Sequence, residues 1–379
     1  AGLAAAVALA PAWVPGTGVG FGRRVGGLTW LLAGAPALPA AALALLGVPG
    51  GRPAPEAFAA GMTRNLGVPD FGPPWAGPVG PSPVWGAPSP PQPTTTDEGS
   101  AMAAKLYFKQ RVLTPGPTSV PEAVLLEMAQ PIIHHRTPQY EALFVEVRAA
   151  LKKLFQTTAE VIPLACSGTG AMEAAVVNTL SAGDQVVIIR AGKFGDRWLD
   201  LAKAYGLSVI DLSAPFGQTV DAARRAETLK SHPEARAVLV QHSEPSTGVL
   251  HDVRAYATVT RQHEAILIVD AVSSLGIADL PMDAWGIDLV ISGSQKGLML
   301  PPGLGFCALN EKAWQKTKRS TLPKFYFSLG DELKYVAKNE VRFTPAVSIV
   351  VGLREALRMV EAEGLANVFK RHDRLARAT

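Results

Sequence analysis

The sequence predicts an α/β fold, a mostly parallel β-sheet with helices on both of its faces. Two observations in residues 102–379 predict it. Short apolar runs rich in Val, Ile and Leu alternate with segments of helical periodicity, and Gly and Pro separate them. Such alternation is typical of βα units, whose crossover helices cover both faces of a parallel sheet. Ligands of these sheets bind beyond the carboxyl ends of the strands, so we look for chemistry there.

The expected elements begin at residue 114. Thr-Pro-Gly-Pro at 114–117 predicts a turn, and Pro121 predicts the start of a helix that reaches Gln130. A second helix is predicted over 139–155 because apolar residues recur at helical spacing, namely Leu143, Val147, Leu151 and Leu154. Further strands are expected at 161–165, 185–190, 207–212, 237–241, 266–270, 289–292 and 304–309, and further helices at 171–180 and 196–205.

Residues 1–101 differ from the rest in composition. The first hundred hold 17 of the 31 prolines and 18 of the 36 glycines, and no Lys, Ile, Tyr, His or Cys. We interpret 1–101 as a low-complexity Ala/Gly/Pro-rich segment outside the enzyme, with Met102 as the natural start. The alternative is a fusion with a membrane or disordered segment, because the uncharged stretch 28–48 is long enough to span a bilayer. Its Ala, Gly and Pro content weakens the drive for insertion, so we expect no membrane partner.

Charge and cysteine content exclude several classes of function. Lys plus Arg number 36 against 32 Asp plus Glu, and a net charge of +4 over 379 residues gives no electrostatic footprint for nucleic acid. Two cysteines, Cys166 and Cys307, cannot form a disulfide scaffold or a Cys-rich metal site. We therefore expect a cytoplasmic protein without a metal.

Three predicted strand ends carry unusual residues. Ser167-Gly168-Thr169 leads into a helix, where free amides favour an anion such as phosphate, although such a turn needs Gly and a Ser cap in any case. Asp270 ends an apolar strand, and it is either a helix cap or a counter-ion for a cationic ligand atom. Lys296 follows another strand, and it is either a solvated loop lysine or a desolvated, nucleophilic amine.

Several motifs together resemble the class V aminotransferases of pyridoxal phosphate (PLP) fold type I. The alanine–glyoxylate and serine–glyoxylate aminotransferases resemble the chain most closely within that class. Gly-Ser-Gln-Lys-Gly at 293–297 and Val-Asp-Ala-Val-Ser-Ser at 269–274 carry the resemblance. Agreement continues in order along the chain, at 114–118, 167–174, 246–250, 301–303 and 343–347.

The resemblance implies a role for each matching residue. Lys296 would form the Schiff base with PLP and then move a proton at the substrate Cα. Asp270 would pair with the pyridinium nitrogen of the cofactor. The remaining cofactor-binding residues would be Ser167, Gly168 and Thr169 at the phosphate, Phe194 stacked on the ring, Gln295 near the phosphate or phenolate, and Thr344 reaching the cofactor of a neighbouring subunit in a homodimer with shared active sites.

The resemblance also implies a domain layout and a reaction. Residues 102–365 would form the PLP-binding large domain with its N-terminal arm, and 366–379 would begin a small C-terminal domain that is largely missing. The expected reaction moves an amino group from alanine or serine to glyoxylate or another 2-oxo acid. Alternatives are another class V enzyme, such as a cysteine desulfurase with a mobile nucleophilic Cys, or a non-catalytic fusion with a degenerate PLP domain.

One departure from the family pattern concerns the cofactor site. The family commonly places Thr or Ser after the Glu that corresponds to Glu244, and that hydroxyl bonds the cofactor. This chain has Pro245 there, which has no donor. Either Ser246 or a water is expected to substitute for it, or the affinity and electronics of the cofactor differ.

Overall fold

The computed structural model describes residue 112 and residues 114–378, which belong to the second of two units into which the chain divides, Met102–Thr379. The expectations for residues 1–101, including the stretch 28–48, lie outside the described residues. Within the described part of the chain, no helix is long and apolar enough to cross a membrane.

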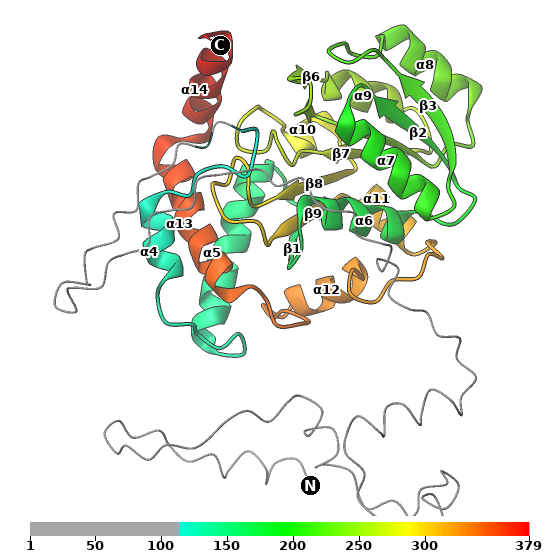
Figure 1. Ribbon diagram of the computed structural model, residues 1–379. Coiled ribbons are helices and arrows are strands. Elements are labelled where there is room, and N and C mark those ends of the chain that lie inside the picture. Colours follow the sequence, from blue (N-terminus) through cyan, green and yellow to red (C-terminus); the bar gives the residue numbers. More distant parts are fainter. Residues whose placement is uncertain (1–111, 113, 379) are drawn as a thin grey trace, which may run out of the picture. The chain divides into compact units, whose positions relative to one another are not determined.

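A seven-stranded sheet forms the centre of the described unit, in the order β1-β9-β8-β7-β4-β2-β3 (Figure 1). Only one of its strands, β9, runs opposite to the others, because both of its neighbours pair with it antiparallel. The expected mostly parallel sheet is therefore confirmed. Its strands are β1 (Val161–Leu164), β2 (Gln185–Arg190), β3 (Ser208–Ser213), β4 (Ala237–Gln241), β7 (Ile266–Asp270), β8 (Leu289–Gly293) and β9 (Gly305–Leu309).

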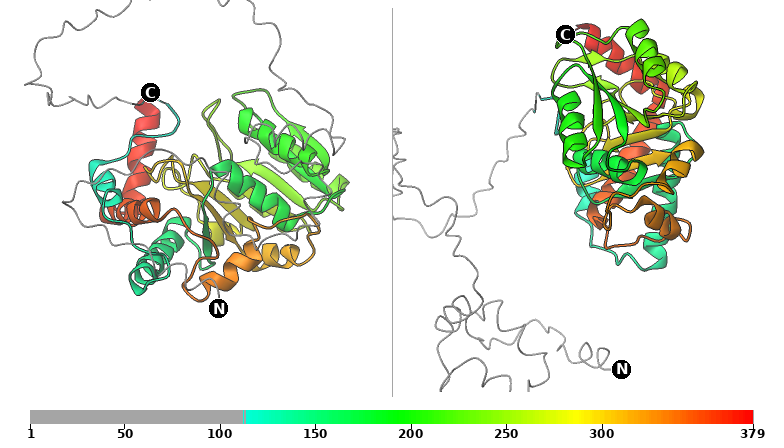
Figure 2. Two further views of the ribbon diagram at one scale, coloured as in Figure 1. Left: turned by 60° about the horizontal axis from the view of Figure 1, so that its bottom comes forward. Right: turned by 90° about the vertical axis from the view of Figure 1, so that its right-hand side faces the viewer.

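Helices cover both faces of this sheet, because successive residues of its strands are buried in two different cores. In β7, for example, Leu267 and Val269 join one core and Ile266 and Ile268 join the other. Helices α4 (Glu122–Met128), α5 (Pro138–Phe155), α9 (Val253–Thr260) and α13 (Val347–Glu363) contribute to the first core. Helices α6 (Gly168–Thr179), α7 (Lys193–Ala204) and α11 (Glu311–Thr317) contribute to the second (Figures 1 and 2).

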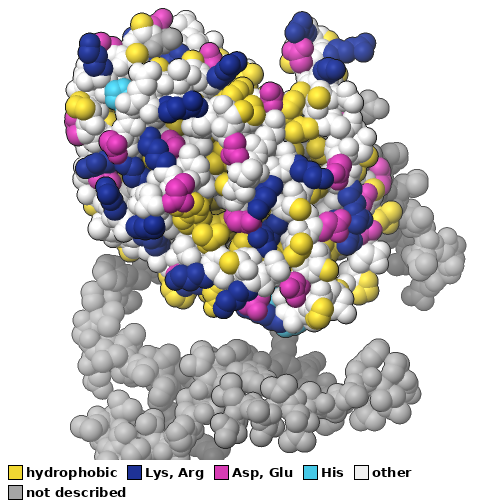
Figure 3. Space-filling model, turned by 180° about the vertical axis from the view of Figure 1, so that it is seen from behind, with side chains coloured by type: hydrophobic (Ala, Val, Ile, Leu, Met, Phe, Trp, Pro, Cys, Tyr) yellow, Lys and Arg dark blue, Asp and Glu magenta, His cyan; other side chains and the backbone are white. Residues whose placement is uncertain are grey.

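The remaining elements lie around this centre. They are α8 (Ala222–Ser231), the two-stranded hairpin β5 (Ser243–Glu244) and β6 (Val249–Leu250), α10 (Met282–Trp285), α12 (Leu329–Val336) and α14 (Leu365–Ala378). Helix α14 stands away from the body of the unit, and Phe369 of this helix lines a hollow with Leu250 and Ile277 (Figure 3). The assignment of 366–379 to the start of a small domain stays a prediction.

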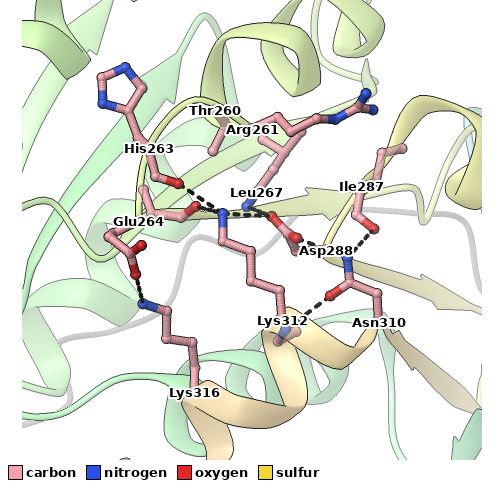
Figure 4. Close-up of polar contacts among 12 residues, drawn as sticks. Thr260, Arg261, His263, Glu264, Leu267, Ile287, Asp288, Asn310, Lys312 and Lys316 are labelled. Atoms are coloured by element: carbon pink, nitrogen blue, oxygen red, sulfur yellow. Dashed lines mark hydrogen bonds and ion pairs between the residues drawn. The ribbon is translucent and has the colours of Figure 1, made fainter.

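A polar cluster around the buried Asp288 holds the amino ends of β7 and β8 to α11 (Figure 4). Asp288 accepts hydrogen bonds from the Leu267 amide and from the Asn310 side chain, both at 2.8 Å. Lys312 donates to the His263 carbonyl at 3.0 Å and lies 3.9 Å from Asp288. This cluster lies at the amino ends of the strands, away from the carboxyl ends where ligands bind, so we interpret it as stabilising the fold.

Candidate active site

A cavity of about 190 Å³ opens beyond the carboxyl ends of β1, β7 and β8. Seven of the eight site residues predicted from the sequence line it. The lining consists of Gly116, Pro117, Ser167, Gly168, Thr169, Met172, Phe194, Arg197, Asp270, Val272, Gln295, Lys296 and Pro302. Strand ends, the first turns of two helices and the 114–118 turn thus meet at one place, as the topology of a parallel sheet predicts.

Lys296 lies in the loop after β8 and is 9% exposed, so it is not a solvated loop lysine. Its Nζ donates to the Pro115 carbonyl at 3.1 Å. Burial lowers the pKa of Lys296, and the Asp270 carboxylate partly offsets this. A lowered pKa raises the fraction of neutral amine, which is the nucleophilic form.

The 114–118 turn, which is distant in sequence, holds the loop that carries Lys296 by hydrogen bonds. Thr118 donates from its amide to the Gln295 carbonyl and from Oγ1 to the Lys296 carbonyl, both at 3.0 Å. Gly116 has φ +150°, and a Cβ there would lie 2.3 Å from Lys296 Cδ. Only glycine fits this close approach to the lysine stem.

Asp270 ends β7 and is 5% exposed. Burial raises the pKa of Asp270 to about 6; the Val272 amide, which donates to Oδ1 at 2.8 Å, lowers it, and the Glu244 carboxylate raises it. A desolvated carboxylate that lines a cavity favours a cationic ligand atom, since such an atom returns the stabilisation lost on leaving water.

The turn after β1 places the N-terminus of α6 at the cavity. Ser167 caps the helix by accepting from the Gly170 amide at 3.4 Å. The helix begins at Gly168 rather than at 171 as predicted. Ser167 is its N-cap, so the Gly-Thr-Gly segment that follows already belongs to the first turn of the helix. A Cβ on Gly168 would lie 2.6 Å from Val272 Cγ2, so the helix end packs directly on the loop after β7.

Helix α7 forms another wall of the cavity with Phe194 and Arg197. It begins at Lys193 rather than at 196 as predicted, because Glu244 caps it from a distant hairpin. The fully buried Glu244 accepts from the amides of Phe194 and Gly195 at 3.1 and 3.2 Å. Sequence reasoning missed this capping role of Glu244.

Arg197 was also missed by sequence reasoning. Its Nη1 donates to Thr169 Oγ1 at 3.0 Å, and its guanidinium carbon lies 4.7 Å from the centre of the Phe194 ring. Its spacing of three from Phe194 places both residues on one face of α7, but the predicted helix began only at 196 and left Phe194 outside it.

The lining fits PLP. Gln295 Oε1 is buried without a hydrogen-bond partner among the described residues, so the cavity wall holds an unsatisfied acceptor. The same cavity presents a buried amine, a desolvated carboxylate, an aromatic ring and the N-terminus of a 12-residue helix. These groups match, in order, an aldehyde, a ring nitrogen, a ring face and a phosphate.

Two expectations lie outside this cavity. Thr344 is exposed between α12 and α13 and does not line the cavity of its own chain, so its reach to a neighbouring subunit stays a prediction. Ser246 does not line the cavity either, so its substitution for the missing hydroxyl at Pro245 stays a prediction. Its Oγ donates to Glu244 at 2.6 Å and accepts from the Lys193 amide at 3.0 Å, so it helps to cap α7.

Neither of the two thiols lines the cavity, and burial raises the pKa of both. Cys307 is fully buried in β9, and burial raises its pKa well above the ordinary value. Burial raises the pKa of Cys166 to about 12. Neither residue is the mobile, ionised thiol that a cysteine desulfurase requires, so this alternative is not favoured. Within residues 114–378, no group of three His, Cys, Asp or Glu gathers to hold a metal ion.

The fold and the lining define a PLP-dependent enzyme of fold type I, and comparison with known proteins gives its family. The family model for aminotransferase class V matches residues 113–379. This chain belongs to the class V aminotransferases and is a PLP-dependent aminotransferase.

The proteins that are similar to this chain carry different names. A protein named soluble hydrogenase, small subunit, from Synechococcus sp. (strain PCC 6716) is 48% identical over 274 residues, which are 72% of this chain and 71% of that protein. A serine–glyoxylate aminotransferase of Hyphomicrobium methylovorum is 41% identical over 270 residues, 69% of this chain and 66% of that protein. The solved alanine–glyoxylate aminotransferase of Nostoc sp. matches with a TM-score of 0.69 and 32% identity, over 75% of this chain and 76% of that one.

Proposed function

We propose that this enzyme transfers an amino group from alanine or serine to glyoxylate or another 2-oxo acid. The observation that carries the proposal is that the buried Lys296 amine and the buried Asp270 carboxylate line one cavity at the N-terminus of α6. The names of the similar glyoxylate aminotransferases support the choice of substrates.

Lys296 and Asp270 then have the central tasks in the reaction. When bound, PLP supplies an electron sink for a carbanion at the substrate Cα. Lys296 holds the cofactor covalently and moves the proton at that carbon, for which a partly desolvated amine is suited. Asp270 maintains the positive charge of the ring nitrogen.

The remaining residues bind and orient the cofactor. Ser167, Gly168 and Thr169 hold the phosphate at the positive end of the α6 dipole. Phe194 covers one face of the ring, and Gln295 lies at the phosphate or phenolate of the cofactor, to which its side-chain N–H group can donate. We further propose a homodimer in which Thr344 completes the partner's site, and a cytoplasmic location, which the free thiols Cys166 and Cys307 support.

Glycine formation tests the proposal. The full chain is loaded with PLP and incubated with glyoxylate and either alanine or serine, with aspartate as a competing donor. We expect glycine to form from alanine or serine in the wild type and not in Lys296→Ala. Glycine from aspartate alone would contradict the proposed donor, and no glycine with any donor would contradict the reaction.

A further inference from the structure

Arg197 is the feature of the cavity that the roles above leave unused. Among the described residues that line the cavity, it and Lys296 are the two basic ones. Its guanidinium is fixed on two sides, by the bond to Thr169 Oγ1 at 3.0 Å and by the Phe194 ring at 4.7 Å. A planar cation held between a hydrogen-bond acceptor and an aromatic face has lost most of its conformational freedom before any ligand binds.

The bond to Thr169 determines what that hydroxyl can do. A threonine hydroxyl has one proton to donate and two lone pairs. Because Arg197 donates to the oxygen, the proton of Thr169 is directed elsewhere and stays available for an acceptor. At the N-terminus of α6, beside free amides, the acceptor that suits this proton is an anion such as a phosphate oxygen.

The charge of Arg197 acts on the two groups that carry the proposed chemistry. Arg197, Asp270 and Lys296 line the same cavity, so each charge lies close to the other two. Glu244 is a further charged group near Asp270, whose carboxylate also accepts a hydrogen bond from the Val272 amide. A fixed cation favours the ionised carboxylate and the neutral amine at the same time. A site that uses Asp270 as a counter-ion and Lys296 as a nucleophile needs this pair of states.

We propose that Arg197 is a positioning residue of the cofactor site, which orients the Thr169 hydroxyl as a donor to the phosphate and holds a fixed positive charge that keeps Asp270 ionised and Lys296 neutral. This inference rests on the proposed use of Lys296 and Asp270 with PLP. A purely structural tie between α6 and α7 would give the same contacts, but it would leave the ionisation of Lys296 unchanged when the charge is removed.

The test compares three variants of the full chain. Arg197→Gln removes the charge but keeps a donor for Thr169, and Arg197→Lys keeps the charge but loses the planar stack. Arg254→Gln is the matched control, because it removes one positive charge from an exposed position of α9. If Arg197→Gln does not fold, Arg197→Met takes its place, since its side chain packs on Phe194 without a charge.

The measured quantity is the rate at which PLP becomes attached to Lys296, trapped with borohydride and followed from about pH 6 to about pH 10. The midpoint of this profile reports the pKa of the amine. We expect Arg197→Gln to raise the midpoint by about one unit, so that attachment at neutral pH slows about tenfold. Arg197→Lys and Arg254→Gln should keep the midpoint of the wild type, with weaker PLP binding in Arg197→Lys.

The outcomes separate this inference from the proposed function. If the wild type attaches PLP at Lys296 and Arg197→Gln or Arg197→Met shows the same midpoint, Arg197 is only structural and this inference alone is overturned. If Arg254→Gln shifts the midpoint as much as Arg197→Gln, the effect is general charge and the inference is also overturned. If the wild type attaches no PLP at Lys296, the proposed function and this inference are both overturned.

Discussion

At the scale of single residues, the chemistry proposed for the site depends on the buried amine of Lys296. Lys296 is enclosed by the 114–118 turn, and its Nζ bonds the Pro115 carbonyl. We expect Lys296→Ala to abolish covalent attachment of PLP, because no other lysine lines the described cavity. Borohydride reduction and peptide mapping measure this. Lys193→Ala, at an exposed lysine of α7, is the control and should keep the adduct. A pyridoxyl group on another lysine of Lys296→Ala would refute the assignment.

The second residue-scale prediction concerns the carboxylate. Asp270→Asn keeps the size and a polar group, but it removes the negative charge that we propose faces the ring nitrogen of PLP. We expect attachment to Lys296 to persist while the transamination rate falls about 10³-fold or more, since a placed electrostatic group contributes about 3–4 kcal/mol to the transition state. Single-turnover kinetics on the PLP-loaded variant measure the loss. A rate within tenfold of the wild type would mean that Asp270 is only a local cap for the Val272 amide.

The sequence allowed the position of a cavity residue to be predicted where that position follows from the residue's own strand. Lys296 and Asp270 directly follow or end apolar strands, so the parallel sheet brings them together. Glu244 and Arg197 could not be found in this way, because their contacts join elements that are far apart in the chain. The contacts of Ser246 also join distant elements, since its hydroxyl bonds Glu244 and the start of α7, and its expected substitution for the missing hydroxyl stays a prediction.

At the scale of secondary-structure elements, strands were easier to predict than helix starts. The strands β2, β4 and β7 have the predicted bounds, because their apolar runs are short and bounded by polar residues. Helices α6 and α7 begin three residues earlier than predicted. In α7 the cause is a tertiary contact. The N-cap residue is a glycine, which has no side chain to cap the helix, and the Glu244 carboxylate accepts hydrogen bonds from the first amides instead, so the helix can start at Lys193.

The polar cluster around Asp288, at the amino end of the sheet, gives a prediction at this scale (Figure 4). Asp288→Ala removes the acceptor of the Leu267 amide and of Asn310, and it leaves Lys312 without its ion pair. We expect the free energy of unfolding to fall by about 2–3 kcal/mol, measured by urea denaturation. Asp288→Asn keeps an acceptor and should lose less. Equal losses in both variants would show that the charge, and not the acceptor, determines the stability.

At the scale of the whole molecule, two buried groups give the stability opposite dependences on pH. His242 is 2% exposed and bonds Ser274, and burial lowers its pKa to about 4. Because the unfolded chain binds this proton near pH 6.5, the contribution of His242 is present above pH 6.5 and is lost as the pH falls towards 4. Asp270 has a raised pKa of about 6, so its contribution is present below pH 3.8 and is lost as the pH rises through 6.

Each of these contributions amounts to about 3 kcal/mol, so they nearly cancel between pH 4 and 6 in the protein without cofactor. A bound pyridinium removes the cost of ionising Asp270 and should leave the His242 dependence alone. We therefore expect pyridoxamine 5′-phosphate, which forms no imine, to raise the melting temperature more at pH 6.5 than at pH 4.5. Asp270→Asn, as the control, should show a stabilisation that does not grow with pH over this interval. If wild type and Asp270→Asn gained equally at both pH values, the carboxylate would not be the group that meets the ring nitrogen, and the cofactor orientation proposed for this cavity would be wrong.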